Sequence, residues 1–263
     1  MNTEALQRVT IDGVGRLYND PKQDLWLPSV STVLDVRPTP EALKQWKERV
    51  DNYDELMSWY QNRGTLLHAE CLSQLTPKDP DTDEPIVEIW GKDEQESEDE
   101  LKDSDKWDEY ERDREWALEA WEVVKMVSNI DTVLDCETFI FETDIGYAGQ
   151  FDLLYHDNEA NETVLADLKT SKNVYDKHQI QLAAYAMAVP IAVDRLDVIR
   201  INPDRRDWEV SSSHTWAVDR RDLENEFIEL RAKLEREKLE TIEETILNAD
   251  EDEEGVMFEK PGE

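Results

Sequence analysis

Three extended segments in a row, separated by short turns, constrain the fold of this chain more than any other feature of its sequence. They cover residues 132–143, 147–157 and 163–170, and all three are rich in β-branched and aromatic residues. "DIG" separates the first two segments and "NEANE" separates the last two. Because turns this short join strands that lie side by side, the sequence predicts three sequential antiparallel strands at the centre of the chain.

The region upstream of these strands is predicted to be mostly helical. Residues 25–36 read as an extended segment interrupted by Pro28. A first helix is expected over residues 39–50, where Thr39 would cap the helix and Pro40 would occupy its first turn.

Two more helices are predicted before the strands. One covers residues 62–75 and is entered through Gly64. The other lies near residues 113–127, where apolar residues recur at helical spacing and would form its buried stripe: Trp116, Ala120, Val123 and Val127. Residues 77–115 hold eighteen acids and six bases, and they are expected to form an acidic helical insertion.

Helices and a hairpin follow the central strands. A helix is predicted over residues 174–189, a hairpin over residues 196–213 and a last helix over residues 219–234. The last helix would bury four apolar side chains: Leu223, Phe227, Leu230 and Leu234. This order indicates an α/β fold, a central mixed β-sheet flanked by helices, in a single domain over residues 1–248. Residues 249–263 are expected to be an acidic, disordered tail.

The charge of the chain is strongly acidic. It carries 64 acidic and 29 basic residues, a formal net charge of -35, yet it also has nine tryptophans, which disordered acidic chains lack. The composition favours a folded protein adapted to multimolar salt, as in halophiles, where the Debye length shrinks to about 3 Å or less. An acidic mimic of DNA is the alternative. Net charge does not exclude nucleic-acid binding, because concentrated salt screens long-range repulsion.

Several classes of protein are excluded by what the sequence lacks. Cys71 and Cys136 are too few for a disulfide framework or a four-thiolate cluster. The first residues show no signal-peptide pattern and no apolar run approaches about 18 residues, so a soluble, cytoplasmic protein without a membrane partner is expected. No glycine loop for phosphate is recognisable, so no bound nucleotide is expected.

Two carboxylates and a lysine are predicted to converge on the central strands. Asp152 and Asp167 would face each other on adjacent strands, and Lys169 would leave the same face as Asp167. Carboxylates suit Mg²⁺, and the lysine can hold or help to deprotonate a water that attacks a phosphate. A surface ion pair is the alternative. The apolar residues around Asp167 indicate a central strand, where a charge needs a reason, and they favour the functional interpretation.

The motifs "GYAGQFDLL", "VLADLKTS" and "QIQLAAYA" follow one another in the second half of the chain. In this order they resemble G-x-x-D, (D/E)-x-K-T and Q-x-x-x-Y of the PD-(D/E)XK nuclease superfamily, specifically of its RecB-like exonuclease branch. The N-terminal part of phage and mitochondrial-type members is resembled by three upstream segments: "PSVSTVL", a helix that bears Trp46, and "RGTLLHAE". The resemblance spans about residues 26–190, in the order of the family throughout.

The resemblance implies a restriction-endonuclease-like core and a metal site. Asp152 and Asp167 would be metal ligands, joined by the carbonyl of Leu168, and Lys169 would be catalytic. His68 matches a helical histidine of the family and would be a further ligand. Asp167 stands where glutamate is commoner in the family, and the shorter side chain reduces the reach to the metal.

Supporting and DNA-binding roles follow from the same resemblance. Gln181 and Tyr185, four residues apart on one helical face, would support the site or hold DNA. A strand glutamate that lines the site in many relatives could be Glu137 or Glu142. Candidates for contacts with phosphates are Thr170, Ser171, Lys172 and Arg63.

The activity that the resemblance implies is a Mg²⁺- or Mn²⁺-dependent deoxyribonuclease without an iron–sulfur cluster. We expect an exonuclease that acts on DNA with free ends, in repair or recombination, in the high-salt cytoplasm of a haloarchaeon or its virus. The alternatives are a sequence-specific endonuclease and a non-catalytic protein, either a decayed nuclease-fold subunit or a DNA mimic. The intact set of Asp152, Asp167 and Lys169 favours the enzyme over the decayed subunit.

Overall fold

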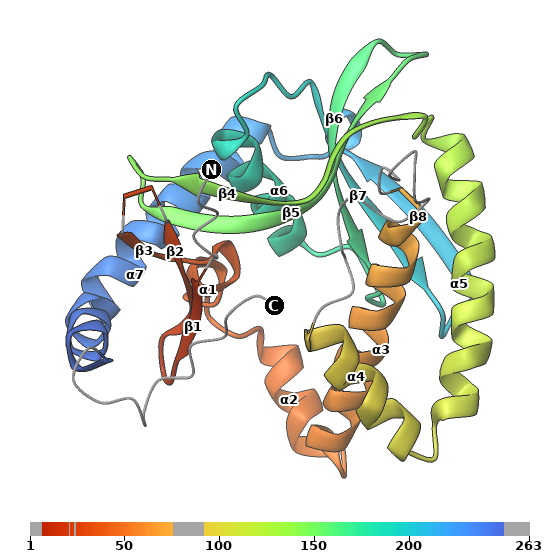
Figure 1. The fold of residues 1–263 in the computed structure, drawn as a ribbon, viewed down its shortest axis with the longest axis horizontal. Helices are drawn as coiled ribbons and strands as arrows, with labels where there is room; N and C mark the ends of the chain where they lie inside the picture. Colours follow the sequence, from red (N-terminus) through yellow and green to blue (C-terminus); the bar gives the residue numbers. More distant parts are fainter. Residues whose placement is uncertain (1–6, 21, 24, 76–91, 250–263) are drawn as a thin grey trace.

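The strands predicted at the centre of the chain belong to a five-stranded mixed sheet with the order β4-β5-β6-β7-β8 (Figure 1). The computed structural model describes residues 7–20, 22–23, 25–75 and 92–249. The strands of this sheet are β4 (Thr132–Glu142), β5 (Tyr147–Asp157), β6 (Glu162–Lys169), β7 (Arg195–Asn202) and β8 (Asp207–Ser212). β4, β5 and β6 pair antiparallel as predicted, β7 runs parallel to β6, and β8 closes the predicted hairpin.

Helices cover both faces of the sheet (Figure 1). One face is covered by α1 (Val30–Leu34), α6 (Asp176–Ala188) and α7 (Arg220–Ala249). The other face is covered by α3 (Tyr53–Ser73) and α5 (Trp107–Val127), with α4 (Lys92–Asp103) packed against α3. A 3-10 turn, η1 (Ser213–Thr215), follows β8. The predicted α/β fold, a central mixed sheet flanked by helices, is confirmed.

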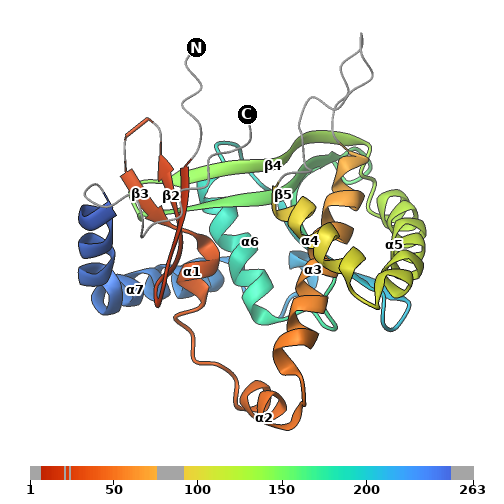
Figure 2. The same cartoon turned by 60° about the horizontal axis from the view of Figure 1, so that its bottom comes forward.

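A second, three-stranded sheet lies beside β5. Its strands are β1 (Gln7–Ile11), β2 (Gly15–Asp20) and β3 (Leu25–Pro28), in that order. Tyr18 and Leu27 pack on Ala148 of β5, and Ser29 forms a β-bridge to the same residue. Figure 2 shows this sheet at one end of the molecule and α2 (Glu41–Arg49) set apart from both sheets.

Two predictions upstream of the main sheet are wrong at helix starts. The segment 25–36 is not extended throughout, because after β3 the side chain of Ser29 accepts a hydrogen bond from Thr32 N at 3.1 Å and starts α1. The N-cap of α2 is Pro40 and not Thr39, and Pro40 has an extended ψ of 136° and no side chain that can cap.

α3 does not begin at Gly64 but at Tyr53. Gly64 lies in the interior of the helix, where glycine is usually unfavourable. A Cβ at this position would lie 2.9 Å from Thr170 Oγ1 at the end of β6. The glycine therefore allows α3 to approach β6 closely, which is a tertiary reason that local sequence does not show.

α5 begins inside the predicted insertion and buries a different stripe from the one predicted. Val123 and Val127 are 38% and 56% exposed. The buried stripe instead consists of Tyr110, Asp113, Ala117, Ala120, Trp121 and Val124. Because Trp121 is the largest of these side chains and is fully buried, this stripe removes more apolar surface from water.

Two other predictions concern the ends of the chain and the insertion. In α7, Leu223, Phe227 and Leu234 are buried as predicted, and Leu230 is partly buried. Of the acidic insertion, residues 92–103 form α4, whereas residues 76–91 lie outside the described residues, as do residues 250–263 of the predicted tail. Among the helices in the described part of the chain, none combines the length and apolar character that crossing a membrane requires.

His178 is expected to make the fold sensitive to acid. Burial first, then Lys169 and Lys177, lowers the pKa of His178 from 6.5 to about 3, and its Nδ1 accepts a hydrogen bond from Tyr175 N at 3.3 Å. Between these two pKa values the unfolded chain binds one proton more than the fold, so stability falls as pH falls from 6.5 towards 3. In His178→Asn this dependence should be shallower by about 1.4 kcal/mol per pH unit.

Urea unfolding of both proteins between about pH 4 and pH 8 measures this difference. Above pH 7 the two curves should run parallel, since His178 is then neutral in the folded and unfolded states. Parallel curves below pH 6 as well would contradict the assignment of a neutral, buried imidazole.

Candidate active site

Three carboxylates lie in a row across three neighbouring strands of the main sheet. Glu137 and Asp152 lie between the paired positions Cys136↔Leu153 and Thr138↔Phe151 of β4 and β5, and Asp152 and Asp167 lie one residue beyond the pair Leu153↔Ala166 of β5 and β6. Residues that face each other across antiparallel strands point to the same side of the sheet. The predicted juxtaposition of Asp152 and Asp167 is therefore confirmed, and Glu137 extends the row by one strand.

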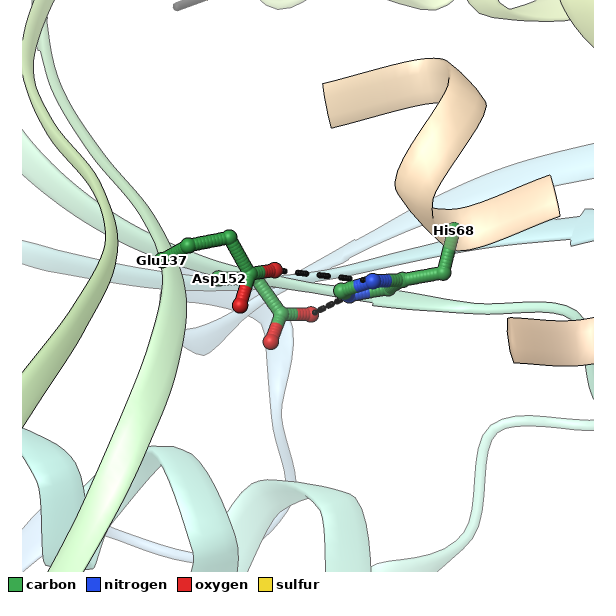
Figure 3. Close-up of side chains that lie close together, drawn as sticks. All are labelled: His68, Glu137 and Asp152. Atoms are coloured by element: carbon green, nitrogen blue, oxygen red, sulfur yellow. Dashed lines mark ion pairs between the residues drawn. The ribbon is translucent and has the colours of Figure 1, made fainter. Parts of the chain in front are cut away.

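His68 reaches this row from α3. Its Nε2 lies 2.9 Å from Asp152 Oδ2, and its Nδ1 lies 3.5 Å from Glu137 Oε1 (Figure 3). One ligand atom from each of these three residues lies within 4.8 Å of the others. Figure 3 shows the two carboxylates side by side and facing the imidazole ring.

Lys169 completes the group from the end of β6. Its Nζ lies 2.8 Å and 2.7 Å from the two carboxylate oxygens of Asp167, whose side chain is fully buried. Between them in the chain, Leu168 N donates a hydrogen bond of 2.7 Å to Asp152 Oδ2. Asp152 is thus held between an imidazole and a backbone amide, and Asp167 is held by the ammonium group.

Glu137 owes its position to an irregular turn of β4. Its φ of 50° is left-handed, a conformation that is rare for a residue with a side chain. Asp135 accepts hydrogen bonds from Cys136 N at 3.0 Å and from the Thr138 hydroxyl, and Gln150 Nε2 donates to the Glu137 carbonyl at 3.1 Å. These contacts hold the strained residue with its side chain at the site.

The charges of the site are strongly coupled. Burial opposes the charge on His68, but Asp152 and then Glu137 outweigh it and raise the pKa of His68 to about 9. Burial raises the pKa of Glu137 to about 8 and that of Asp167 to about 7. Burial acts in the same sense on Asp152, but His68 and Lys169 lower its pKa below the usual range. Without a metal, the site therefore holds protons at neutral pH on His68 and Glu137.

The residues present fit a divalent cation. His68, Glu137 and Asp152 offer one imidazole nitrogen and two carboxylate oxygens, a donor set that can hold a divalent cation. Glu137 Oε1 is buried and accepts no hydrogen bond from any described residue. A buried carboxylate oxygen without a donor is stabilised when a cation takes its lone pair.

The predicted pair of Gln181 and Tyr185 lines the same cavity, which has a volume of about 470 Å³. Gln181 Nε2 donates a hydrogen bond of 2.9 Å to Tyr185 Oη. A Cβ at Gly149 would lie 2.5 Å from Tyr185 Cε1, so the tyrosine ring packs directly on the backbone of β5. The glycine of G-x-x-D and the tyrosine of Q-x-x-x-Y therefore form one contact.

Two predicted site residues are elsewhere. Arg63 is 2% exposed, and its Nη1 lies 2.7 Å from a carboxylate oxygen of Asp113 and 2.7 Å from one of Asp204. Because these two ion pairs already neutralise its buried side chain, Arg63 is not available to bind a phosphate. Glu142 is the last residue of β4, and its Oε1 accepts a hydrogen bond of 3.0 Å from Asp144 N in the turn that follows. Glu137, and not Glu142, is the strand glutamate at the site.

The other predicted DNA contacts differ in position. Thr170 lines the cavity next to Gly64, and Leu168 also lines it. Lys172 is exposed and lies outside the cavity lining, and the hydroxyl of Ser171 donates to the Asn173 carbonyl. The roles of all these residues in binding DNA stay predictions.

Sequence reasoning did not find several residues that line the cavity. They come from the second sheet, the start of α1 and the start of α4: Arg8, Arg16, Tyr18, Ser29, Ser31, Asp93 and Glu94. Ser29 and Ser31 lie in "PSVSTVL", which resembles the N-terminal part of the family, and the motifs quoted for the resemblance do not include the other five.

A mixed sheet that presents carboxylates and a lysine on adjacent strands, under a helix that adds a histidine, defines a nuclease core of the restriction-endonuclease type. The family model of the PD-(D/E)XK nuclease superfamily matches residues 43–253. The chain belongs to this superfamily.

Comparisons with individual proteins give no assignment finer than the superfamily. No curated protein matches the chain. Among the matching solved structures is one titled "Crystal structure of SSO0001", at 16% sequence identity and a TM-score of 0.30. The match covers 44% of this chain and 54% of that chain, so this chain spans about half the length of that protein.

Proposed function

We propose that this chain is a Mg²⁺- or Mn²⁺-dependent deoxyribonuclease of the RecB-like branch that degrades DNA from free ends. The observation that carries the proposal is the convergence of His68, Glu137, Asp152 and Lys169 on one cavity, with the buried Asp167 paired to Lys169. The order of motifs along the chain supports the RecB-like branch, and the preference for free ends rests on analogy with that branch.

Each residue has a distinct part in the proposed hydrolysis. His68, Glu137 and Asp152 would hold the cation, and Asp167 and the carbonyl of Leu168 stay predicted as further ligands. The cation would supply Lewis-acid stabilisation of phosphate charge and a water of lowered pKa. Asp167 and Asp152 raise the pKa of Lys169 against the effect of its burial, so the side chain stays an ammonium group. As an ammonium group, Lys169 donates a hydrogen bond to the attacking water or to a phosphate oxygen and offsets the negative charge that develops there.

The experiment that tests this function compares linear and circular DNA of the same sequence in roughly molar KCl with Mn²⁺. We expect digestion of linear DNA and no cutting of the closed circle, because an exonuclease requires a terminus. Cutting of the circle at a fixed site would show a sequence-specific endonuclease instead.

The fold is expected to require salt. Acids outnumber bases by 64 to 29, so lowering the ionic strength restores repulsion among the surplus carboxylates. Thermal unfolding midpoints should rise between about 0.1 M and about 3 M KCl. We propose the high-salt cytoplasm of a haloarchaeon, or of a cell infected by its virus, as the setting. A midpoint that stays constant or falls as KCl rises would contradict both the salt requirement and the proposed high-salt setting.

A further inference from the structure

One wall of the cavity carries arginines that the proposed chemistry does not use. Arg8 of β1 and Arg16 of β2 both line the cavity. They belong to a part of the chain with nearly balanced charge, since residues 1–63 contain 8 bases and 10 acids, whereas residues 64–263 contain 21 and 54. Acidic residues are therefore sparser in the part of the chain that contains this wall, whereas bases are about as frequent there as elsewhere.

The strand pattern puts both arginines on one face of the small sheet. Arg8 pairs with Tyr18, and Thr10 pairs with Arg16, so these four side chains point the same way. The alternate residues Val9, Ile11 and Leu17 form a separate apolar cluster. The two arginines are thus diagonal neighbours, at a spacing of roughly 7–8 Å that can hold one strand of phosphodiester backbone at two points.

Arg8 is occupied by a carboxylate from the acidic insertion. Its Nη1 and Nη2 lie 2.9 Å and 3.0 Å from the two oxygens of Asp93, at the start of α4. Both side chains are partly exposed, at 24% and 43%. Both residues line the cavity, so the pair connects β1 to α4 at its wall. A bidentate contact of this kind is also the geometry in which arginine binds phosphate.

Arg16 has no such partner. Its side chain is exposed and donates a hydrogen bond of 3.4 Å to Tyr18 Oη, and it forms no ion pair with any described residue. In a chain with a net charge of -35, a cavity-lining arginine without a carboxylate partner indicates that a different anion binds there.

We propose that Arg8 and Arg16 hold the phosphodiester backbone of the DNA strand that enters the active site, and that Asp93 takes the place of a phosphate on Arg8 while DNA is absent. The proposal rests on the proposed nuclease function and adds to it a DNA-binding wall and a competitor within the chain. Asp93 then reduces the fraction of molecules in which Arg8 can bind DNA, and the apparent dissociation constant for DNA rises by the inverse of that fraction.

A purely structural clamp between β1 and α4 is the alternative. The two interpretations predict different changes in DNA binding for two substitutions that each remove this ion pair. A clamp predicts that Arg8→Gln and Asp93→Asn change DNA binding alike. A competitor predicts opposite changes. Arg8→Gln removes a contact with phosphate, whereas Asp93→Asn allows Arg8 to make that contact more often.

The test measures binding of a fluorescent single-stranded DNA of about 20 nucleotides by fluorescence anisotropy, with Mg²⁺ present and over a range of KCl concentrations. All proteins carry Lys169→Met, which suppresses cleavage. Arg8→Gln should raise the dissociation constant about tenfold and make its logarithmic salt dependence shallower by about 0.7, as expected for one lost phosphate contact. Asp93→Asn should lower the dissociation constant about three- to tenfold.

The pair of Arg37 and Glu226 provides a matched control. Its atoms lie 3.4 Å apart with side chains 33% and 43% exposed, and both residues line a separate groove along α7. Arg37→Gln and Glu226→Gln make the same changes in net charge, and each should alter DNA binding by less than about twofold. Changes in the same direction for Arg8→Gln and Asp93→Asn, or changes no larger than in the controls, would overturn the inference alone. A Lys169→Met parent that binds no DNA would overturn the proposed function as well.

Discussion

Lys169→Met is expected to reduce turnover by about 10²-fold or more while metal binding and the fold stay close to wild type. Methionine keeps most of the length and apolar volume of the side chain but removes the ammonium group that contacts both oxygens of Asp167. If Lys169 stabilises developing charge, its loss affects the transition state and little else. Single-turnover cleavage rates, measured beside Mn²⁺ titration calorimetry and thermal melts, separate these three effects.

The alternative for Lys169 is a structural ion pair. In that case Lys169→Met would keep wild-type turnover and would destabilise the protein, because the buried Asp167 would lose its partner. Arg195→Met is a suitable control, since Arg195 pairs with Asp157, Glu162 and Asp197 away from the cavity. This control should lower stability and leave turnover per folded molecule unchanged.

Asp152→Asn is expected to weaken Mn²⁺ binding by about 10²-fold or more and to reduce turnover with it. Asp152 lies at the centre of the row of carboxylates and contacts both His68 Nε2 and Leu168 N. Asparagine keeps the shape and one acceptor but removes the charge that a hard cation requires. The same change should affect metal affinity far more than Lys169→Met does, because it removes a ligand and not a donor.

The affinity of the wild type for Mn²⁺ should also rise with pH between about pH 7 and pH 9. In the metal-free site the pKa of His68 is about 9 and that of Glu137 is about 8, so both hold protons that the cation must displace. Below pH 7 this displacement opposes binding most strongly. Calorimetry in buffers of different ionisation enthalpy measures the protons released, and no release at pH 7 would contradict the proposed ligands.

Local pattern was sufficient to predict the centre of the fold. The short turn between β5 and β6 determines their register, and Asp152 and Asp167 lie one residue beyond the paired positions Leu153 and Ala166. His68 was predicted from the resemblance alone, since one histidine in a helix carries no signal of its own. The structure places it 2.9 Å from Asp152, as a metal ligand requires.

One physical cause explains why Arg63 and Gly64 were misplaced and why Glu137 and Glu142 could not be distinguished: the contacts that decide their positions come from other elements of the chain. The partners of Arg63 lie 50 and 141 residues away, and no local pattern indicates that they neutralise it. The choice between Glu137 and Glu142 depends on the left-handed turn at Glu137, which Gln150 of the neighbouring strand stabilises. Gly64 resembled a helix start because its true contact, Thr170, belongs to a different element.

The most direct test of the account is release of acid-soluble nucleotides from linear DNA by the purified chain in about 2 M KCl, with Mn²⁺ and with excess EDTA. The account predicts digestion with Mn²⁺ and none with EDTA, with activity restored when Mn²⁺ is added back. Digestion that continues undiminished in EDTA, or no digestion by a folded protein that binds Mn²⁺, would contradict a metal-dependent nuclease at this site.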